Sequence, residues 1–247
     1  MALYDRIGKH YTRTRAADPR IATAIERALA GCDTVLNVGA GAGAYEPANR
    51  RVIALEPSWT MIVQRHREGA PVVQARAEAL PFGDAAFDAV LAVLTVHHWS
   101  DRRQGFSECR RVARRRIVFL TIDPAVLQQF WVYHYFPTLL SIDTAIFPQM
   151  ATFGDVFGVA AVEPLLIPAD CLDGFLGAYW RRPEEFLNPS VHAGISTFAQ
   201  LPASELQAGV RALQQDIESG SWAQAHAQLL RRDALDVGYR LVECCLV

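Results

Sequence analysis

Residues 35 to 46 read Val-Leu-Asn-Val-Gly-Ala-Gly-Ala-Gly-Ala-Tyr-Glu, and this stretch predicts the fold. Its apolar start is typical of a buried strand, and three glycines follow at alternate positions, Gly39, Gly41 and Gly43. Glycine lets the chain turn sharply and lets a ligand approach the backbone. The N–H groups at the next helix start would then face a polar or anionic ligand group.

A second apolar run, Val52-Ile-Ala-Leu55, ends in Glu56. An acidic side chain at such a strand tip is placed to accept hydrogen bonds from both hydroxyls of a ribose. The two stretches together predict a nucleoside-containing cofactor on an open α/β sheet. Gly39-x-Gly41-x-x-Ala44 also fits the relaxed dinucleotide fingerprint, so a nicotinamide or flavin enzyme is an alternative, as is a tight turn without a ligand.

Composition bounds the class of protein. The 247 residues suffice for one α/β domain with an insertion, and 51% hydrophobic with 20% charged residues is ordinary for a soluble protein. The formal net charge of -2 gives no reason to expect nucleic acid or membrane partners. Five scattered or adjacent cysteines lack metal-type spacing, so we expect reduced thiols and no metal. The first residues lack an apolar signal core, which favours a cytoplasmic location.

Strands and helices alternate over a core of about residues 18–123, which predicts a doubly wound sheet. Only Ala44 to Arg50 connect the first two strands, so the helix there is expected to be little more than one turn, and Ser58 is expected to cap a helix reaching about Arg67. After residue 123 the pattern becomes helical and aromatic. We expect a helical cap over about 124–158 and 171–232, and two last sheet strands in 159–167 and 236–247.

Three segments carry a resemblance to a known family: Val35–Gly43, Val52–Met61 and Gln74–Trp99. Their order resembles the class I S-adenosylmethionine (SAM)-dependent methyltransferases, of the small-molecule methyltransferase domain 11 type. The most specific piece is Ala-Glu-Ala-Leu-Pro-Phe-Gly-Asp-Ala-Ala-Phe-Asp-Ala-Val, residues 77–90. The core resemblance covers about residues 30 to 122. Residues 1–14 contain a stretch similar to the leading helix that closes over the cofactor in many relatives.

The resemblance implies a Rossmann-like, doubly wound, seven-stranded, mostly parallel sheet with a helical cap insertion, in a single methyltransferase domain over 1–247. It also implies S-adenosyl-L-methionine as the cofactor. The implied contacts to its methionine part come from Gly39, Ala40, Gly41, Gly43, Leu94, Tyr11 and Arg15. Those to the ribose and adenine come from Glu56, Pro57, Met61, Ala77 and Glu78.

The chain departs from the family pattern in three places. Asn37 stands where an acidic residue is frequent, so a contact to the cofactor's amino group would be neutral. Arg76 stands where an Asp often binds the adenine amine, and a guanidinium cannot accept a hydrogen bond. The short first crossover is expected to leave Tyr45 and Glu46 near the cofactor mouth.

His97 and His98 follow the fourth strand at its C-terminal end, where open α/β sheets bind ligands. An imidazole there is a candidate base near neutral pH, from either histidine. One of them could instead cap the strand end, and neither need be chemical. Asp123 is a second candidate base or a substrate anchor, or else the start of a turn. Further positions fit packing or surface roles at least as well as substrate contacts: Trp99, Trp131, Tyr133, Trp180, Arg181, Arg182 and the basic run 110–116.

The sequence thus predicts a cytoplasmic SAM-dependent methyltransferase that acts on an O or C atom of a small, partly apolar metabolite, in small-molecule biosynthesis. Two alternatives are a SAM-binding enzyme with non-methylating chemistry and a non-catalytic SAM-binding regulatory protein. The expected partner is a small-molecule substrate, without nucleic acid or membrane, and the chain is expected to be a monomer or homodimer.

Overall fold

The computed structural model describes residues 5, 15–158 and 160–246, and it contains the expected seven-stranded sheet. The strand order is β3-β2-β1-β4-β5-β9-β6, and β9 runs antiparallel to both of its neighbours. The predicted Rossmann-like, mostly parallel sheet is therefore confirmed. Its strands are β1 (Thr34–Val38), β2 (Arg51–Leu55), β3 (Val72–Val73), β4 (Phe87–Val93), β5 (Ala113–Ile122), β6 (Ala160–Pro164) and β9 (Tyr239–Cys245).

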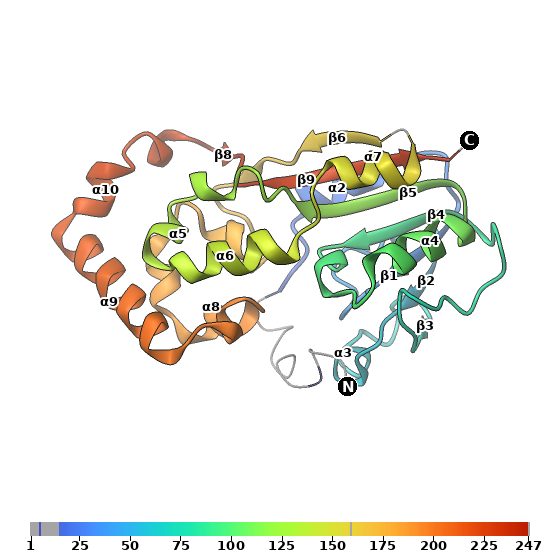
Figure 1. Ribbon diagram of the computed structural model, residues 1–247, viewed down its shortest axis with the longest axis horizontal. Helices are drawn as coiled ribbons and strands as arrows, with labels where there is room; N and C mark the ends of the chain where they lie inside the picture. Colours follow the sequence, from blue (N-terminus) through green and yellow to red (C-terminus); the bar gives the residue numbers. More distant parts are fainter. Residues whose placement is uncertain (1–4, 6–14, 159, 247) are drawn as a thin grey trace.

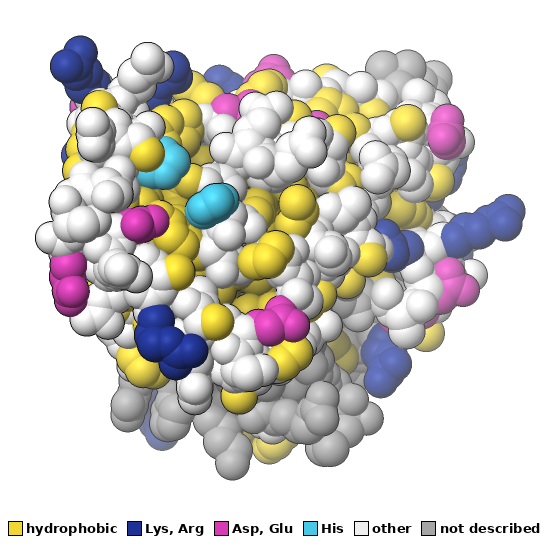
Figure 2. Space-filling model, turned by 60° about the vertical axis from the view of Figure 1, so that its left-hand side comes forward, with side chains coloured by type: hydrophobic (Ala, Val, Ile, Leu, Met, Phe, Trp, Pro, Cys, Tyr) yellow, Lys and Arg dark blue, Asp and Glu magenta, His cyan; other side chains and the backbone are white. Residues whose placement is uncertain are grey.

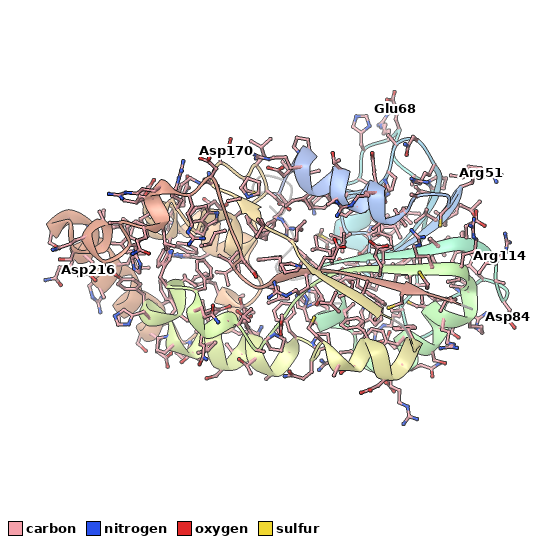
Figure 3. The ribbon with its side chains drawn as sticks, turned by 90° about the horizontal axis from the view of Figure 1, so that it is seen from above. Arg51, Glu68, Asp84, Arg114, Asp170 and Asp216 are labelled. Carbon is pink, nitrogen blue, oxygen red and sulfur yellow. The ribbon has the colours of Figure 1, made fainter. Side chains whose placement is uncertain are left out.

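Helices cover both faces of the sheet (Figure 3). On one face lies α2 (Pro19–Ala28), which Asp18 caps by accepting a hydrogen bond from the Arg20 backbone amide. On the other lie α4 (Arg102–Val112) and α7 (Ala151–Phe157). Successive strand residues point to opposite faces, so β1, β2, β4, β5 and β9 each contribute to two separate apolar cores, as strands buried on both faces must.

The helical cap lies beyond the carboxyl ends of β1, β4 and β5 (Figure 1). A two-stranded sheet of β7 (Ile167–Pro168) and β8 (Ala234–Leu235) also forms outside the main sheet. The α-helices of the cap are α5 (Val132–Tyr135), α6 (Pro137–Ile146), α8 (Pro189–Gly194), α9 (Ala203–Ser219) and α10 (Ser221–Ala225).

The cap boundary differs from the prediction. We expected 124–158 to belong to the cap, but α7 packs on the sheet, where the Phe153 ring lies 5.0 Å from that of Phe119. The sequence of α7 is apolar on one face, as cap helices are, so only its packing partner distinguishes it. The expected strand 159–167 also divides, into β6 and the separate β7.

Two other expectations about local structure are wrong. Residues 41–50 form turns and no helix, because Pro47 and the close approach of β2 leave no room for one. The helix after Ser58 is α3 (Trp59–Ile62), which ends well before Arg67. Ser58 does cap it, accepting a hydrogen bond from the Met61 amide. Of the helices in the described ranges, none combines the length and apolarity that a bilayer crossing needs.

Candidate active site

The glycine loop, residues 39–43 between β1 and β2, is fixed by close packing and backbone hydrogen bonds. Gly39 has φ +69°, and a Cβ there would lie 1.9 Å from the Thr95 hydroxyl oxygen. The backbone amides of Gly39 and Ala40 both donate to the Leu55 carbonyl, at 2.8 and 3.0 Å. Only glycine tolerates both this backbone conformation and this contact, so the loop presents bare backbone along one wall of a cavity.

This larger cavity has a volume of about 300 Å³ and lies at the carboxyl ends of β1, β2 and β4. That volume is at the lower end of the range for small-molecule sites. The residues that line it include most of those predicted to bind the cofactor: Arg15, Gly39, Ala40, Gly41, Glu56, Pro57, Met61, Ala77, Glu78 and Leu94.

Of the described residues predicted to bind the cofactor, Gly43 alone is not in that lining. Tyr11 and the expected N-terminal helix over 1–14 lie outside the described residues, apart from Asp5. Gly43 faces away from the cavity, because a Cβ there would lie 3.2 Å from Glu46 Oε2 and 3.3 Å from Arg65 Nη1. Gly43 thus makes room for an ion pair beneath the loop.

Glu56 is buried at the tip of β2, as predicted. Its Oε2 accepts a hydrogen bond from the Gly41 amide and its Oε1 accepts one from the Ser58 amide, each at 2.8 Å. Burial raises the pKa of this carboxyl, although both hydrogen bonds oppose the shift. A carboxylate offers about four lone-pair sites, so two remain for the hydroxyls of a ribose.

Asn37 presents an acceptor in the same cavity. Its Nδ2 donates to Glu46 Oε1 at 3.3 Å, which fixes the amide orientation because a carboxylate only accepts. Asn37 Oδ1 is buried and has no partner among the described residues. A buried acceptor left unpaired is costly, and an amino group of a ligand would satisfy it.

Tyr45 lines the cavity as expected, whereas Glu46 does not. Glu46 instead forms a buried ion pair with Arg65 at 2.6 Å, and Arg65 also donates to the Gly41 carbonyl at 3.2 Å. The ion pair therefore stabilises the glycine loop through the hydrogen bond from Arg65. Arg65 was not predicted, since nothing in its sequence context distinguishes it from a surface arginine.

Arg15 joins the N-terminal side of the site to the cap. Its Nε donates to Asp173 Oδ1 at 2.5 Å and its Nη2 to Asp173 Oδ2 at 3.1 Å. The Tyr45 hydroxyl donates to the same carboxylate at 2.9 Å. Asp173 is thus the common partner of Arg15 and Tyr45, and its role was missed because it lies in an irregular segment with no motif.

Glu78, which the resemblance places near the adenine, also accepts hydrogen bonds from a neighbouring segment. Its Oε1 accepts hydrogen bonds from the Ser100 amide at 2.7 Å, the Ser100 hydroxyl at 2.8 Å and the Asp101 amide at 3.2 Å. Burial favours a higher pKa, but these hydrogen bonds outweigh it and the pKa of Glu78 is lowered. Arg76 lines the cavity as well.

The two candidate histidines line different cavities. His98 lines the larger cavity, whereas His97 lines a second, smaller cavity of about 60 Å³. Their rings are in contact, with centroids 3.9 Å apart and ring planes tilted by 47°. Burial lowers the pKa of His98 to about 4 and lowers that of His97 well below its usual value, so both imidazoles are neutral near pH 7.

The smaller cavity lies between the sheet and the cap. Ile122 of β5 and Tyr239 of β9 line it on the side of the sheet. On the side of the cap, α6 contributes Asp143 and Phe147. Leu94 and Arg15 line both cavities, so the two are adjacent. Leu94 has φ +50°, an uncommon conformation for a residue with a Cβ.

Other candidates have structural roles. Asp123 lines neither cavity; it accepts from the Ala125 amide and pairs with Arg240 at 3.5 Å. Arg181 and Arg182 donate to backbone carbonyls. Trp99 does line the larger cavity. The remaining aromatics pack inside the cap without reaching either cavity: Trp131, Tyr133 and Trp180.

Arginines of the basic run 110–116 form ion pairs with nearby acidic side chains. Arg111 binds Glu108 and Asp84, and Arg114 binds Asp88 at 2.9 Å. On the cap side of the molecule, basic and acidic side chains are interspersed (Figure 2).

Comparison with known proteins identifies the family. The family model described as a methyltransferase domain matches residues 36–120. A solved structure from Anabaena variabilis, named "Putative methyltransferase from antibiotic biosynthesis pathway", superposes with a TM-score of 0.87 at 32% identity, covering 94% of this chain and 99% of that one.

Two curated relatives match over shorter stretches. The uncharacterized methyltransferase YcgJ of Bacillus subtilis is 32% identical over 100 residues, 36% of this chain and 40% of that protein. The demethylmenaquinone methyltransferase of Thermotoga maritima is 34% identical over 71 residues, 28% of this chain and 31% of that protein. The matches thus span less than half the length of these two relatives. Since the likeness to the Anabaena variabilis protein spans nearly its whole length, the chain belongs to the class I SAM-dependent methyltransferases.

Proposed function

We propose that the chain binds SAM in the larger cavity and transfers its methyl group to an O or C atom of a small, partly apolar metabolite in the smaller one. The observation that carries this proposal is the adjacency of the two cavities, which share Leu94 and Arg15. A methyl donor in one and an acceptor in the other would meet across Leu94.

The lining of the larger cavity fits SAM. Asn37 Oδ1 would accept from the amino group of its methionine part, and the free lone pairs of Glu56 would accept from its ribose. Gly39 and Gly41 would let the ligand approach the backbone. When bound, the cofactor supplies an activated methyl group on a sulfonium, so the protein's task is positioning and exclusion of water.

The neutral histidines favour an O or C acceptor over nitrogen. A neutral imidazole accepts a hydrogen bond or a proton from a hydroxyl or an acidic carbon, whereas an amine nucleophile needs no base. His97 lines the smaller cavity, which makes it the better placed of the two for the acceptor. The Anabaena variabilis protein is named for an antibiotic biosynthesis pathway, which supports a role in small-molecule biosynthesis. A monomer or homodimer in the cytoplasm is part of the same proposal.

Incubation with methyl-labelled SAM and a panel of small phenols and enolisable ketones tests the proposal. We expect S-adenosylhomocysteine and a methylated product to accumulate together. His97→Ala is expected to lower turnover and leave S-adenosylhomocysteine affinity unchanged, whereas His98→Ala is expected to weaken that affinity. Binding of SAM without any methylated product from an acceptor that occupies the smaller cavity would contradict the proposal.

A further inference from the structure

We propose that the methyl acceptor carries a hydroxyl group that donates a hydrogen bond to the carboxylate of Asp143 in the smaller cavity. This inference rests on the proposed function, because it describes the substrate of that same site. It assigns to Asp143 the role of a specificity-determining residue in the cap, a role separate from the glycine loop and the histidines.

Asp143 is buried, with 2% of its surface exposed, on the face of α6 that lines the cavity. Its Oδ2 accepts a hydrogen bond from the Tyr133 hydroxyl at 2.8 Å. In residues 15–158 and 160–246, no second donor reaches this carboxyl and no cation pairs with it. Arg15, the arginine of the same cavity, is directed to Asp173.

A buried carboxyl with unused acceptor capacity costs stability unless something satisfies it. The cap contains a second tyrosine–aspartate pair, Tyr135 and Asp216, with a 2.7 Å hydrogen bond. Asp216 lies at the outer end of the cap and is only partly buried, so solvent can reach its carboxylate (Figure 3). Asp143 has the same tyrosine partner, but it is buried and lines the cavity. A ligand in that cavity is therefore its available second partner.

The rest of the cavity indicates what kind of molecule carries the hydroxyl. Phe147, Phe175, Ile122 and Ile195 form apolar walls. His97 Nδ1 is buried with no partner among the described residues, and the Tyr239 hydroxyl already accepts from the Gly177 amide at 3.2 Å. A cavity of about 60 Å³ that adjoins the larger one at Leu94 and Arg15 suits the hydroxyl-bearing end of a small ring or short chain rather than the whole molecule.

The charge state of Asp143 is compatible with this role. Burial raises the pKa of its carboxyl to about 7, and the hydrogen bond from Tyr133 opposes that shift. The ionised form is thus substantially populated near neutral pH, and a hydrogen bond to an ionised acceptor is about twice as strong as one between neutral groups.

Phenol and toluene test the inference, because they have nearly the same shape and only phenol donates a hydrogen bond. Affinities are measured by NMR titration of the wild-type chain, with and without saturating S-adenosylhomocysteine. We expect phenol to bind about tenfold or more tighter than toluene, the factor that a hydrogen bond to a charged group provides. Asp143→Leu is expected to abolish or reverse this preference.

The matched control is Asp216→Leu, which removes the other tyrosine-bound aspartate and is expected to leave the preference unchanged. Asp143→Asn keeps the shape of the side chain if the leucine variant fails to fold, and it is expected to reduce the preference about threefold or more, since it replaces the charged acceptor with a neutral amide. Equal phenol and toluene affinities in the wild-type chain, no phenol binding, or a wild-type preference in Asp143→Leu would each overturn the inference.

The two proposals fail separately. If S-adenosylhomocysteine binds and the phenol preference is absent, the role of Asp143 is refuted and the cofactor assignment stands. If the phenol preference depends on Asp143 and S-adenosylhomocysteine does not bind, the cofactor assignment is refuted and the hydroxyl site stands.

Discussion

The Glu56 carboxylate accepts a 2.8 Å hydrogen bond from the backbone amide of Gly41, which joins the tip of β2 to the glycine loop. A second hydrogen bond, from the Ser58 amide, holds the same carboxylate at the start of α3. Glu56 therefore organises the site before any ligand binds, and it lines the larger cavity.

Glu56→Ala is expected to weaken S-adenosylhomocysteine binding by roughly 1.5–3 kcal/mol, the scale of hydrogen bonds to a charged group. Calorimetric titration measures the change. Glu68→Ala, at an exposed position on the periphery (Figure 3), is the control and should bind like the wild type. Unchanged affinity in Glu56→Ala would remove this residue from the site.

Gly39→Ala is expected to destabilise the fold by about 2–5 kcal/mol in urea denaturation. Left-handed backbone costs an L-residue about 1–2 kcal/mol, and the contact with Thr95 adds an overpacking cost of about 1–3 kcal/mol. Gly220→Ala separates the two effects, because Gly220 also has positive φ, at +79°, but has open space around its Cβ position. Equal losses in both variants would show that the Thr95 contact carries no cost.

Arg65→Ala is expected to cost about 3–5 kcal/mol of unfolding free energy, because it leaves the buried Glu46 carboxylate unpaired. The exposed pair of Arg27 and Glu163 provides the comparison, and Arg27→Ala should cost less than about 1 kcal/mol. A double-mutant cycle with Glu46→Gln isolates the coupling. A coupling near zero would show that the pair does not support the loop.

The contribution of Asp143 to stability is expected to fall as pH rises from about 4 to about 7. The pKa of Asp143 is about 7 in the fold against 3.8 for an ordinary Asp, so the folded state binds the extra proton within this window and loses the advantage above it. The loss is at most about 4 kcal/mol. Of the groups that face Asp143, Tyr133 and Tyr239 have raised pKa values, His97 has a lowered one, and Arg15 stays charged.

Urea denaturation of the wild type, Asp143→Asn and Asp216→Asn between about pH 5 and pH 8 measures this effect. The difference between wild type and Asp143→Asn should grow with pH in favour of the variant, while Asp216→Asn should follow the wild type. Parallel curves for all three proteins would show that Asp143 titrates at its ordinary pKa.

The sequence predicts the sheet and most of the larger cavity because both depend on local patterns. Buried parallel strands are short apolar runs, and the glycine loop and Glu56 lie within a few residues of strand ends. The resemblance also identified the family correctly. Positions such as Ala77 and Met61 required that resemblance, since an apolar residue near a cavity has no distinctive pattern of its own.

The smaller cavity could not be predicted from the sequence because it depends on tertiary contacts. It brings together the end of β5, the start of β9, α6 and the segment around Ile195, which are far apart in the chain. One signal was present: Asp143 is the single charged residue of the run Pro137–Ile146. The assignment of α7 to the cap failed for the same reason, because an amphipathic helix does not specify which apolar surface it covers.

Calorimetric titration of the wild-type chain with S-adenosylhomocysteine, with NAD as the control ligand, tests the central claim most directly. We expect micromolar binding of S-adenosylhomocysteine and no detectable binding of NAD, because Asn37, Glu56 and the glycine loop match the amino acid and nucleoside parts of the former. Binding of NAD in preference to S-adenosylhomocysteine, or of neither ligand, would contradict the assignment of the larger cavity to SAM.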